Sequence, residues 1–307
     1  KYYGDVIMIK AQVLVIGSGP GGYTAAFRAA DLGKEVVLVE KYESLGGVCL
    51  NVGCIPSKSL LHTAQIINEA KHASQLGISF GDTKIDIDGV KKNKESIVNK
   101  LTGGIQALAK ARKVKVVTGH AKFLSKNQVS LEGTDEVIEF EHCIIAAGSR
   151  VTKLPMFPFN DERVMDSTDA LMMDDIPKRL LVVGGGIIGL EMATIYDALG
   201  SEITIVELGG QIIPAADKDI VSPLLKRIKK NYANIFLNTK VTKMKASKKG
   251  IKVNFEGKDA PKTDTFDKVL VAVGRSPNGQ IIGAENAGVN VDQNGFISTN
   301  NQMQTNV

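Results

Sequence analysis

The apolar positions along the chain predict alternating strands and helices. Residues 11–17 (AQVLVIG) form an apolar run that leads into a group of glycines, which is typical of a buried strand. A helical pattern follows and ends at Gly33, and residues 35–40 (EVVLVE) predict a second buried strand. This strand–helix–strand order predicts an α/β fold with a parallel sheet.

The same order occurs a second time. Residues 179–184 (RLLVVG) lead into glycines, a helical pattern ends at Gly200, and residues 202–207 (EITIVE) predict the next strand. The offset between the copies is constant at 167 residues, from position 17 to 184 and from 40 to 207. The chain therefore contains an internal duplication, and its 307 residues favour two domains.

The remaining segments complete the predicted sheets. Residues 96–113 predict a helix in spite of two central glycines, and residues 114–122, 128–131 and 136–140 alternate like a small antiparallel sheet. Residues 142–148 (HCIIAAG) predict a fully buried strand, with residues 268–274 (KVLVAVG) as its counterpart. Cys143 in this strand is interpreted as a small core residue.

Both copies carry a G-x-G-x-x-G pattern between strand and helix. The first glycine permits a tight turn, the second lets the backbone approach a pyrophosphate, and the third packs helix against strand. Glu40 and Glu207 end the second strands and would accept hydrogen bonds from ribose hydroxyls. The pattern predicts a dinucleotide in each copy, and two glycine turns without a ligand remain the alternative. The glycines are Gly17, Gly19, Gly22, Gly184, Gly186 and Gly189.

Composition and charge narrow the function classes. The net charge of +5 is mild, and the lysine runs at 91–94 and 226–230 lack interleaved aromatic residues, so we expect solvated faces rather than a nucleic-acid site. There is no signal segment and no apolar run of about 18 residues, so we expect a cytoplasmic protein with no membrane partner. Three cysteines are too few for a secreted disulfide framework.

Residues 46–58 (GGVCLNVGCIPSK) carry the most specific pattern. Cys49 and Cys54 are separated by four residues, and Asn51 and Gly53 are expected to take the unusual backbone angles of a small disulfide loop. Pro56 is expected as the first residue of a helix, so Cys54 would lie just before the N-terminus of that helix. The helix dipole and the positive charge of Lys58, about one turn further along, would favour the thiolate form of Cys54. The helix should bury an apolar stripe formed by Leu60, Leu61, Ala64 and Ile67.

A zinc site is the competing use of paired cysteines. It requires two further Cys or His ligands, and neither Cys143 nor the four scattered histidines supply a second pair at suitable spacing. We therefore expect no metal. Two inert core cysteines remain a further alternative.

Five segments resemble the motifs of the dihydrolipoamide dehydrogenases, which are flavin-dependent pyridine nucleotide–disulfide oxidoreductases. They are GGVCLNVGCIPSK, GSGPGG with Glu40, GGGIIGLE with Glu207, CIIAAGSR and VLVAVGRSPN, and the resemblance covers residues 10–307. Glutathione, trypanothione and mercuric reductases are near relatives, and residues 55–58 (IPSK) follow the lipoamide pattern. The resemblance implies two tandem Rossmann-like domains that bind FAD and NAD(P), each with a parallel sheet and a small antiparallel sheet.

The resemblance also implies roles for single residues. The first copy would hold FAD and the second NAD, with Cys49 as the interchange thiol and Cys54 as the thiolate against the flavin. Lys58 and Glu191 resemble the pair that lies near flavin and nicotinamide in this family. Further cofactor-binding residues implied by the resemblance are Lys41, Gly47, Lys58, Ala121, Gly148, Ile187, Ile188, Val241 and Gly274.

The acid at position 207 bears independently on the choice of nucleotide. A carboxylate there would repel the 2′-phosphate of NADP, and residues 201–210 contain no arginine that would bind it. We therefore expect NAD. The implied reaction is oxidation of dihydrolipoyl groups carried by the lipoyl domains of 2-oxo acid dehydrogenase complexes. A related disulfide reductase, of the glutathione or mercuric reductase type, and a non-catalytic nucleotide-binding module are the alternatives.

The same resemblance divides the chain. Residues 1–9 are expected to be a linker or added sequence, residues 10–152 the FAD domain, residues 153–282 the NAD domain, and residues 283–307 the start of a return segment. In the family the pattern continues beyond position 307 into a dimerisation domain, which supplies a catalytic histidine to the partner of a homodimer. None of the four histidines here matches that motif, so we expect this chain alone not to turn over dihydrolipoamide.

Overall fold

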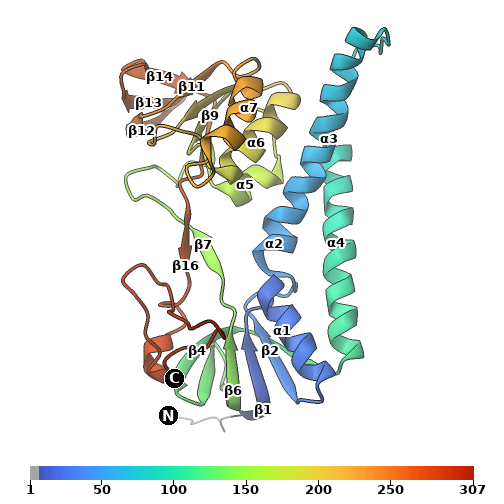
Figure 1. Ribbon diagram of the computed structural model, residues 1–307, viewed down its shortest axis with the longest axis vertical. Coiled ribbons are helices and arrows are strands. Elements are labelled where there is room, and N and C mark those ends of the chain that lie inside the picture. Colours follow the sequence, from blue (N-terminus) through green and yellow to red (C-terminus); the bar gives the residue numbers. More distant parts are fainter. Residues whose placement is uncertain (1–6) are drawn as a thin grey trace. The chain divides into compact units, whose positions relative to one another are not determined.

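The computed structural model describes residues 7–307, which form two units. The first comprises the chain up to Ile55, Ile97–Arg150 and Arg275–Val307, and the second comprises Pro56–Ser96 and Val151–Gly274. The predicted α/β class is confirmed, because each unit combines helices with parallel strands and with a smaller number of antiparallel strands (Figure 1).

The first unit has a six-stranded sheet in the order β3-β2-β1-β6-β5-β4. Strands β1 (Ile7–Ile16), β2 (Val36–Glu40), β3 (Lys115–Thr118) and β6 (Glu136–Ile145) pair in parallel. Strand β5 (Gln128–Glu132) pairs antiparallel with β6 and with β4 (His120–Ser125). The expected small antiparallel part is present in this unit, and it is continuous with the parallel sheet. Strands β4 and β5 extend the parallel sheet, because β6 pairs with β1 on one side and with β5 on the other.

Two strand predictions at this sheet need correction. Strand β1 begins at Ile7 rather than at position 11, and Ile7 already pairs with Glu136; positions 1–6 of the expected linker lie outside the described residues. The segments 136–140 and 142–148 are one strand up to Ile145, and it is not fully buried, since Ile144 is 38% exposed. An apolar run does not reveal whether both of its faces are covered.

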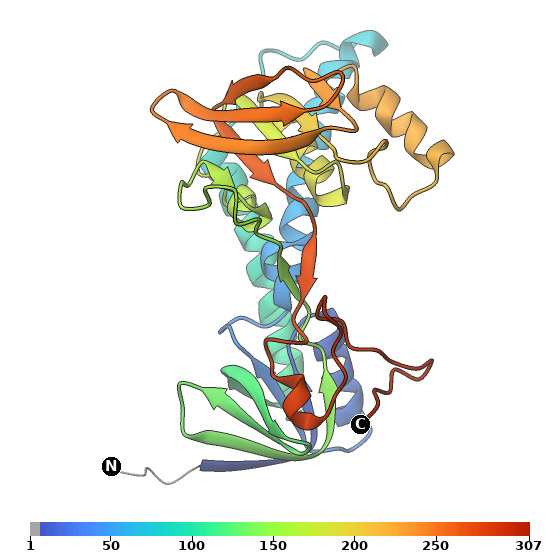
Figure 2. The same cartoon turned by 90° about the vertical axis from the view of Figure 1, so that its left-hand side faces the viewer.

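Alternate residues of β1 face two different cores in the first unit. Val13 and Val15 pack with α1 (Pro20–Asp31) and with the end of α4 (Ile87–Ala111). Leu14 and Ile16 pack on the other face with the return segment, which includes the 3₁₀ helix η2 (Ala284–Ala287). Figure 2 shows this segment, in red, beside the green strands.

Helices α2 (Gly47–Val52) and α3 (Cys54–His72) follow β2, and the 3₁₀ helix η1 (Ala73–Leu76) ends the run. The predicted stripe on α3 is confirmed: Leu60, Ala64 and Ile67 are buried and Leu61 packs against the core of the second unit. Helix α4 starts at Ile87, nine residues before the predicted position 96, and continues through both glycines.

The second unit has a parallel sheet in the order β11-β10-β9-β15-β8 and a separate antiparallel sheet in the order β12-β13-β14. As predicted, β15 pairs with β9 as β6 pairs with β1. The parallel strands are β8 (Val164–Met165), β9 (Arg179–Val183), β10 (Glu202–Val206), β11 (Asn234–Phe236) and β15 (Lys268–Val271). The antiparallel strands are β12 (Lys240–Ser247), β13 (Gly250–Glu256) and β14 (Thr263–Phe266).

The central strand β9 again faces two cores. Leu180 and Val182 pack with α5 (Ser167–Met172), α6 (Ile187–Ala198) and α7 (Lys218–Ile228), whereas Leu181 and Val183 pack with the antiparallel sheet. Strands β7 (Ser149–Val151) and β16 (Arg275–Pro277) pair where the chain passes between units. No helix among residues 7–307 is long and apolar enough to span a membrane.

Candidate functional site

The glycine turns of the two copies obey the same steric rules. Gly17 and Gly184 have φ of +95° and +108°, and a Cβ on either would lie 2.3 Å from a carbonyl oxygen of the neighbouring strand's end. A Cβ on Gly22 would lie 1.7 Å from the Gly17 oxygen, and one on Gly189 would lie 2.2 Å from the Gly184 oxygen. Only glycine fits these positions, because any side chain would displace backbone.

The second glycine of each motif leaves open space. No atom lies within 4 Å of a Cβ built on Gly186, and a Cβ on Gly19 meets only the Gly47 Cα at 4.0 Å. These two glycines are also the N-caps of α6 and α1, and neither has a side-chain cap. No side chain therefore occupies the amides of the first turns, which begin at Gly21 in α1, because Pro20 has no N–H, and at Ile187 in α6. The residues present fit a bound pyrophosphate.

The two acids make matching contacts. The Glu40 carboxylate accepts hydrogen bonds from the Ser18 amide at Oε2 (3.0 Å) and from the Tyr42 amide at Oε1 (3.2 Å). The Glu207 carboxylate accepts from the amides of Gly185 at Oε2 and Gly209 at Oε1, both at 2.7 Å. Each acid thus stands at its own glycine turn, the position at which this type of fold receives a ribose.

The cysteine segment is largely helical. Cys49 lies half-buried in α2, and Cys54 is exposed as the first residue of α3, two positions earlier than the predicted helix start. Gly53 joins the helices with φ −145° and ψ −116°, and a Cβ on it would lie 2.8 Å from the Val48 oxygen.

The expectation for Asn51 is wrong. This residue lies inside α2 rather than at an unusual backbone angle. Its side-chain amide donates to the carbonyl oxygens of Leu45 (3.1 Å) and Gly47 (2.9 Å). Asn51 therefore holds the turn before Cys49, where Gly46 and Gly47 have φ of 107° and 59°.

Lys58 and Glu191 form an ion pair in the second unit. The Lys58 Nζ lies 2.6 Å from the Glu191 Oε1, and the side chains are 59% and 20% exposed. Lys58 is the fifth residue of α3, the helix that Cys54 begins, whereas Glu191 lies on α6. The structure thus brings two of the predicted catalytic residues together, while their roles stay predictions.

The other residues implied by the resemblance lie at several kinds of position. Ala121 in β4 and Val241 in β12 are buried in the cores, so only their main chains could meet a ligand. Gly148 and Gly274 follow β6 and β15 with positive φ. Ile187, the first residue of α6, is 62% exposed. The remaining three are Ile188 on α6, Lys41 after β2, and Gly47, whose Cβ would lie 2.6 Å from the Gly19 Cα.

Cys143 packs against the core of the first unit, as expected. Burial raises the pKa of its thiol to about 12. The thiol therefore stays protonated at neutral pH, in contrast to a nucleophilic cysteine.

Sequence reasoning missed Ser18, which is fully buried and bonds Glu40 through its hydroxyl (2.6 Å). The middle positions of a G-x-G-x-x-G pattern are variable, so the pattern gave no signal for it. Only its small size and hydroxyl, next to an acid 22 residues on, hinted at a contact.

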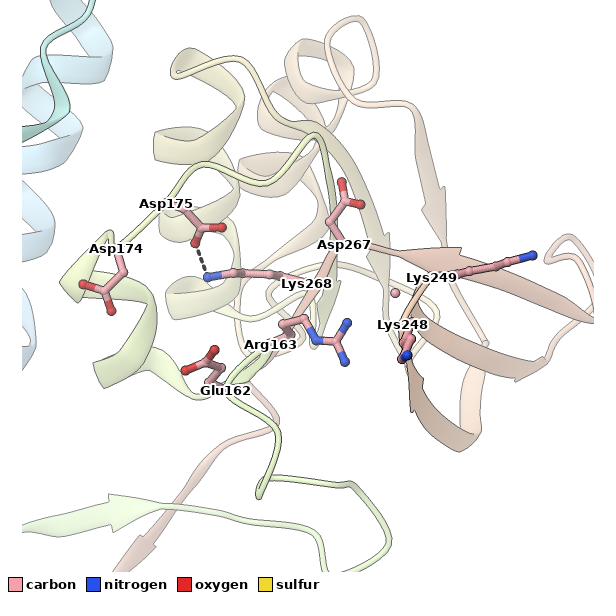
Figure 3. Close-up of a pocket in the computed structure, with 9 residues that line it drawn as sticks. Glu162, Arg163, Asp174, Asp175, Lys248, Lys249, Asp267 and Lys268 are labelled. Carbon is pink, nitrogen blue, oxygen red and sulfur yellow. Dashed lines mark hydrogen bonds and ion pairs between the residues drawn. The ribbon is translucent and has the colours of Figure 1, made fainter.

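A polar pocket in the second unit contains none of the predicted site residues (Figure 3). Its acids and bases are equal in number, and Lys268 pairs with Asp175 inside it. A lining with balanced charges favours neither an anionic nor a cationic ligand. The lining residues are Glu162, Arg163, Asp174, Asp175, Lys248, Lys249, Gly250, Asp267 and Lys268. Within the described chain no group of three or more His, Cys, Asp or Glu residues could hold a metal ion.

Comparison with known proteins connects this geometry to a family. The dihydrolipoyl dehydrogenases of Vibrio cholerae and Haemophilus influenzae are 55% and 54% identical to the chain over 302 residues. The alignments cover 97% of this chain and 63% of each relative, so the chain spans less than two thirds of their length.

A solved structure is also similar. The Cu(II) complex of an HOCl-induced flavoprotein disulfide reductase from Escherichia coli has a TM-score of 0.84 and 27% identity, with coverage of 97% of this chain and 64% of that one. The family model described as pyridine nucleotide-disulphide oxidoreductase matches residues 11–307. The chain therefore belongs to the pyridine nucleotide-disulphide oxidoreductase family.

Proposed function

We propose that the chain supplies the nucleotide-binding folds and the redox cysteines of a dihydrolipoyl dehydrogenase, which oxidises protein-bound dihydrolipoyl groups with NAD⁺. One observation carries this proposal: Cys49 in α2 and Cys54 at the first residue of α3 lie in a chain that is 55% identical to such an enzyme. The substrate would be presented by lipoyl domains of 2-oxo acid dehydrogenase complexes, to a cytoplasmic homodimer.

The two copies would hold different nucleotides. FAD would lie on residues 10–152 with its ribose at Glu40, and NAD on residues 153–282 with its ribose at Glu207. The open backbone at Gly19 and Gly186 supports this assignment, since both helix N-termini can receive phosphates. Bound FAD would carry an electron pair from the cysteines to NAD⁺.

The cysteines would perform the thiol chemistry. A substrate thiolate attacks Cys49 in the oxidised pair, which forms a mixed disulfide and releases Cys54 as a thiolate. The second substrate thiol, after losing its proton, displaces Cys49, so the substrate leaves as a cyclic disulfide and both cysteines are reduced. Cys54 is exposed as the first residue of α3, so solvent can reach the released sulfur.

Lys58 and Glu191 would place a positive and a negative charge near the flavin and the nicotinamide. Their 2.6 Å ion pair supports a joint role, because each side chain limits the orientation of the other.

NAD is favoured over NADP by the charge at the second copy. Glu207 accepts two backbone hydrogen bonds that hold its carboxylate at the glycine turn, and a carboxylate beside the ribose would repel a 2′-phosphate. Leu208 beside it is 71% exposed and offers no positive charge.

A substrate panel on the protein that contains this chain tests the proposal. We expect NAD⁺ reduction with dihydrolipoamide, and loss of that reaction in Cys49→Ser and Cys54→Ser. Faster reduction of glutathione disulfide or mercuric ion by NADPH would instead support a disulfide reductase, the class to which the 27% identical solved structure belongs. Nucleotide binding without any redox reaction would support a non-catalytic module.

A further inference from the structure

The side chain of Ser18 links the first acid to the turn before Cys49. Ser18 is fully buried between Gly17 and Gly19, and its hydroxyl donates to the Glu40 Oε2 at 2.6 Å. Glu40 is itself only 6% exposed, so the bond is shielded from water. Hydrogen bonds to charged acceptors of this length are among the stronger ones in proteins.

The second contact of Ser18 reaches the cysteine segment. The Gly46 amide donates to the Ser18 Oγ at 3.2 Å and to the Ser18 carbonyl oxygen at 3.0 Å. Gly46 is the N-cap of α2, the helix that contains Cys49. An unbroken series of contacts therefore runs from the Glu40 carboxylate through the Ser18 hydroxyl to the first turn of that helix.

The second copy lacks this link. The position equivalent to Ser18 is Gly185, which has no hydroxyl, and a Cβ there would lie 3.1 Å from the Glu207 Cβ. The backbone contacts of the acid are otherwise the same in both copies. The serine thus distinguishes the copy that is followed by the redox cysteines.

We propose that Ser18 is a positioning residue that couples ribose binding at Glu40 to the placement of Cys49. Ribose hydroxyls that bond to the carboxylate fix its orientation, this fixes the Ser18 hydroxyl, and the Gly46 turn then becomes more rigid. This inference rests on the proposed FAD site, because it requires a ribose at Glu40.

The test measures alkylation of Cys49 in the reduced, flavin-free chain with iodoacetamide, with and without ADP. ADP supplies the adenosine ribose and diphosphate but no flavin ring, so it does not shield the thiol directly. A Glu207→Gln background weakens ADP binding at the second copy. Fragment-ion mass spectrometry of the 42–58 peptide, which carries both Cys49 and Cys54, assigns the label to Cys49.

We expect ADP to slow alkylation of Cys49 by about two- to tenfold, which is the factor that one hydrogen bond's net free energy supplies. In Ser18→Ala the rate should be the same with and without ADP, and Ser18→Thr, which keeps the hydroxyl, should restore the effect. Ser44→Ala is the matched control, since the Ser44 hydroxyl bonds only the neighbouring Leu45 oxygen (3.4 Å) and should leave the effect intact.

Three results would overturn the inference. If ADP binds, as followed by calorimetry, but leaves the wild-type rate unchanged, there is no coupling. If Ser18→Ala, folded by circular dichroism, keeps the full ADP effect, the coupling does not pass through Ser18. If ADP does not bind at all, the proposed nucleotide site in the first copy fails together with the inference.

Discussion

The two copies of the nucleotide-binding fold agree at their glycine turns and differ around them. In each copy the first glycine has a positive φ and the third glycine packs closely against backbone atoms. The acid of each copy accepts hydrogen bonds from two backbone amides. In the first copy, however, the acid has a third donor, and two antiparallel strands extend the sheet. In the second, the antiparallel strands form their own sheet. Backbone sterics fix the shared part, whereas the side chains around it determine what each copy can do.

The largest effect is expected at the third glycines. Gly22→Val should abolish nucleotide binding by the first copy and Gly189→Val by the second, because the Cβ would lie 1.7 Å or 2.2 Å from a backbone oxygen. We expect a loss of about 3 kcal/mol or more in stability of the affected unit. Thermal unfolding and nucleotide binding measure this. Gly21→Ala is the control: a Cβ there meets no atom within 4 Å, so stability should hold or rise.

Removing the acid should lower the free energy of unfolding more in the first copy than in the second. Glu40→Ala leaves three donors without their acceptor, namely the Ser18 amide and hydroxyl and the Tyr42 amide, while Glu207→Ala leaves two. We expect losses of about 3 kcal/mol and about 2 kcal/mol in the free energy of unfolding, since each buried donor left without an acceptor costs stability. Denaturant unfolding of both variants decides the order, and equal losses would contradict the role given to Ser18.

Cys143 and Cys54 should differ in reactivity. The pKa of Cys143, raised by burial from 9.0 to about 12, keeps its thiol protonated through pH 10, so iodoacetamide should modify Cys54 and spare Cys143. The pKa of Cys143 is higher in the folded state than in the unfolded state, so the unfolded chain loses this proton first as pH rises. The contribution of the buried thiol to the free energy of unfolding is therefore complete below pH 9 and declines as pH rises toward 12. Rapid labelling of Cys143 in the folded protein at pH 8 would contradict the burial.

The smallest effect on stability is expected for the ion pair on α3 and α6. Glu191→Gln should change the free energy of unfolding by less than about 1 kcal/mol, because the Lys58 side chain is 59% exposed and water screens the pair. A large loss of turnover in this variant without a loss of stability would support the proposed role of Glu191 near the cofactors. A loss of stability well above this limit would show that the pair is structural.

Much of the fold could be predicted from the sequence because its signals are local. The apolar runs before each glycine turn predicted β1 and β9, the runs after each following helix predicted β2 and β10, and the constant offset predicted the duplication. The acids and glycines of the candidate site follow from the same spacing. The apolar stripe at Leu60, Ala64 and Ile67 gave α3.

Features that depend on partners distant in sequence could not be predicted in this way. Whether β4 and β5 extend the sheet depends on the second edge of β6, and no pattern in those strands reveals it. The exposure of Ile144 likewise depends on what covers the strand. Asn51 was expected in a strained turn because of its residue type, whereas its amide bonds to Leu45 and Gly47 allow α2 to form.

The proposed function requires FAD to lie against the cysteines in the first copy and NAD to accept the electrons in the second. Reduction of the flavin-loaded protein, followed by absorbance, tests it most directly. We expect NADH to produce a long-wavelength thiolate–flavin charge-transfer band, Cys54→Ser to remove this band, and NADPH at the same concentration to produce little of it. A flavin-loaded protein that gives no band with NADH, or the same band with NADPH, would contradict the account.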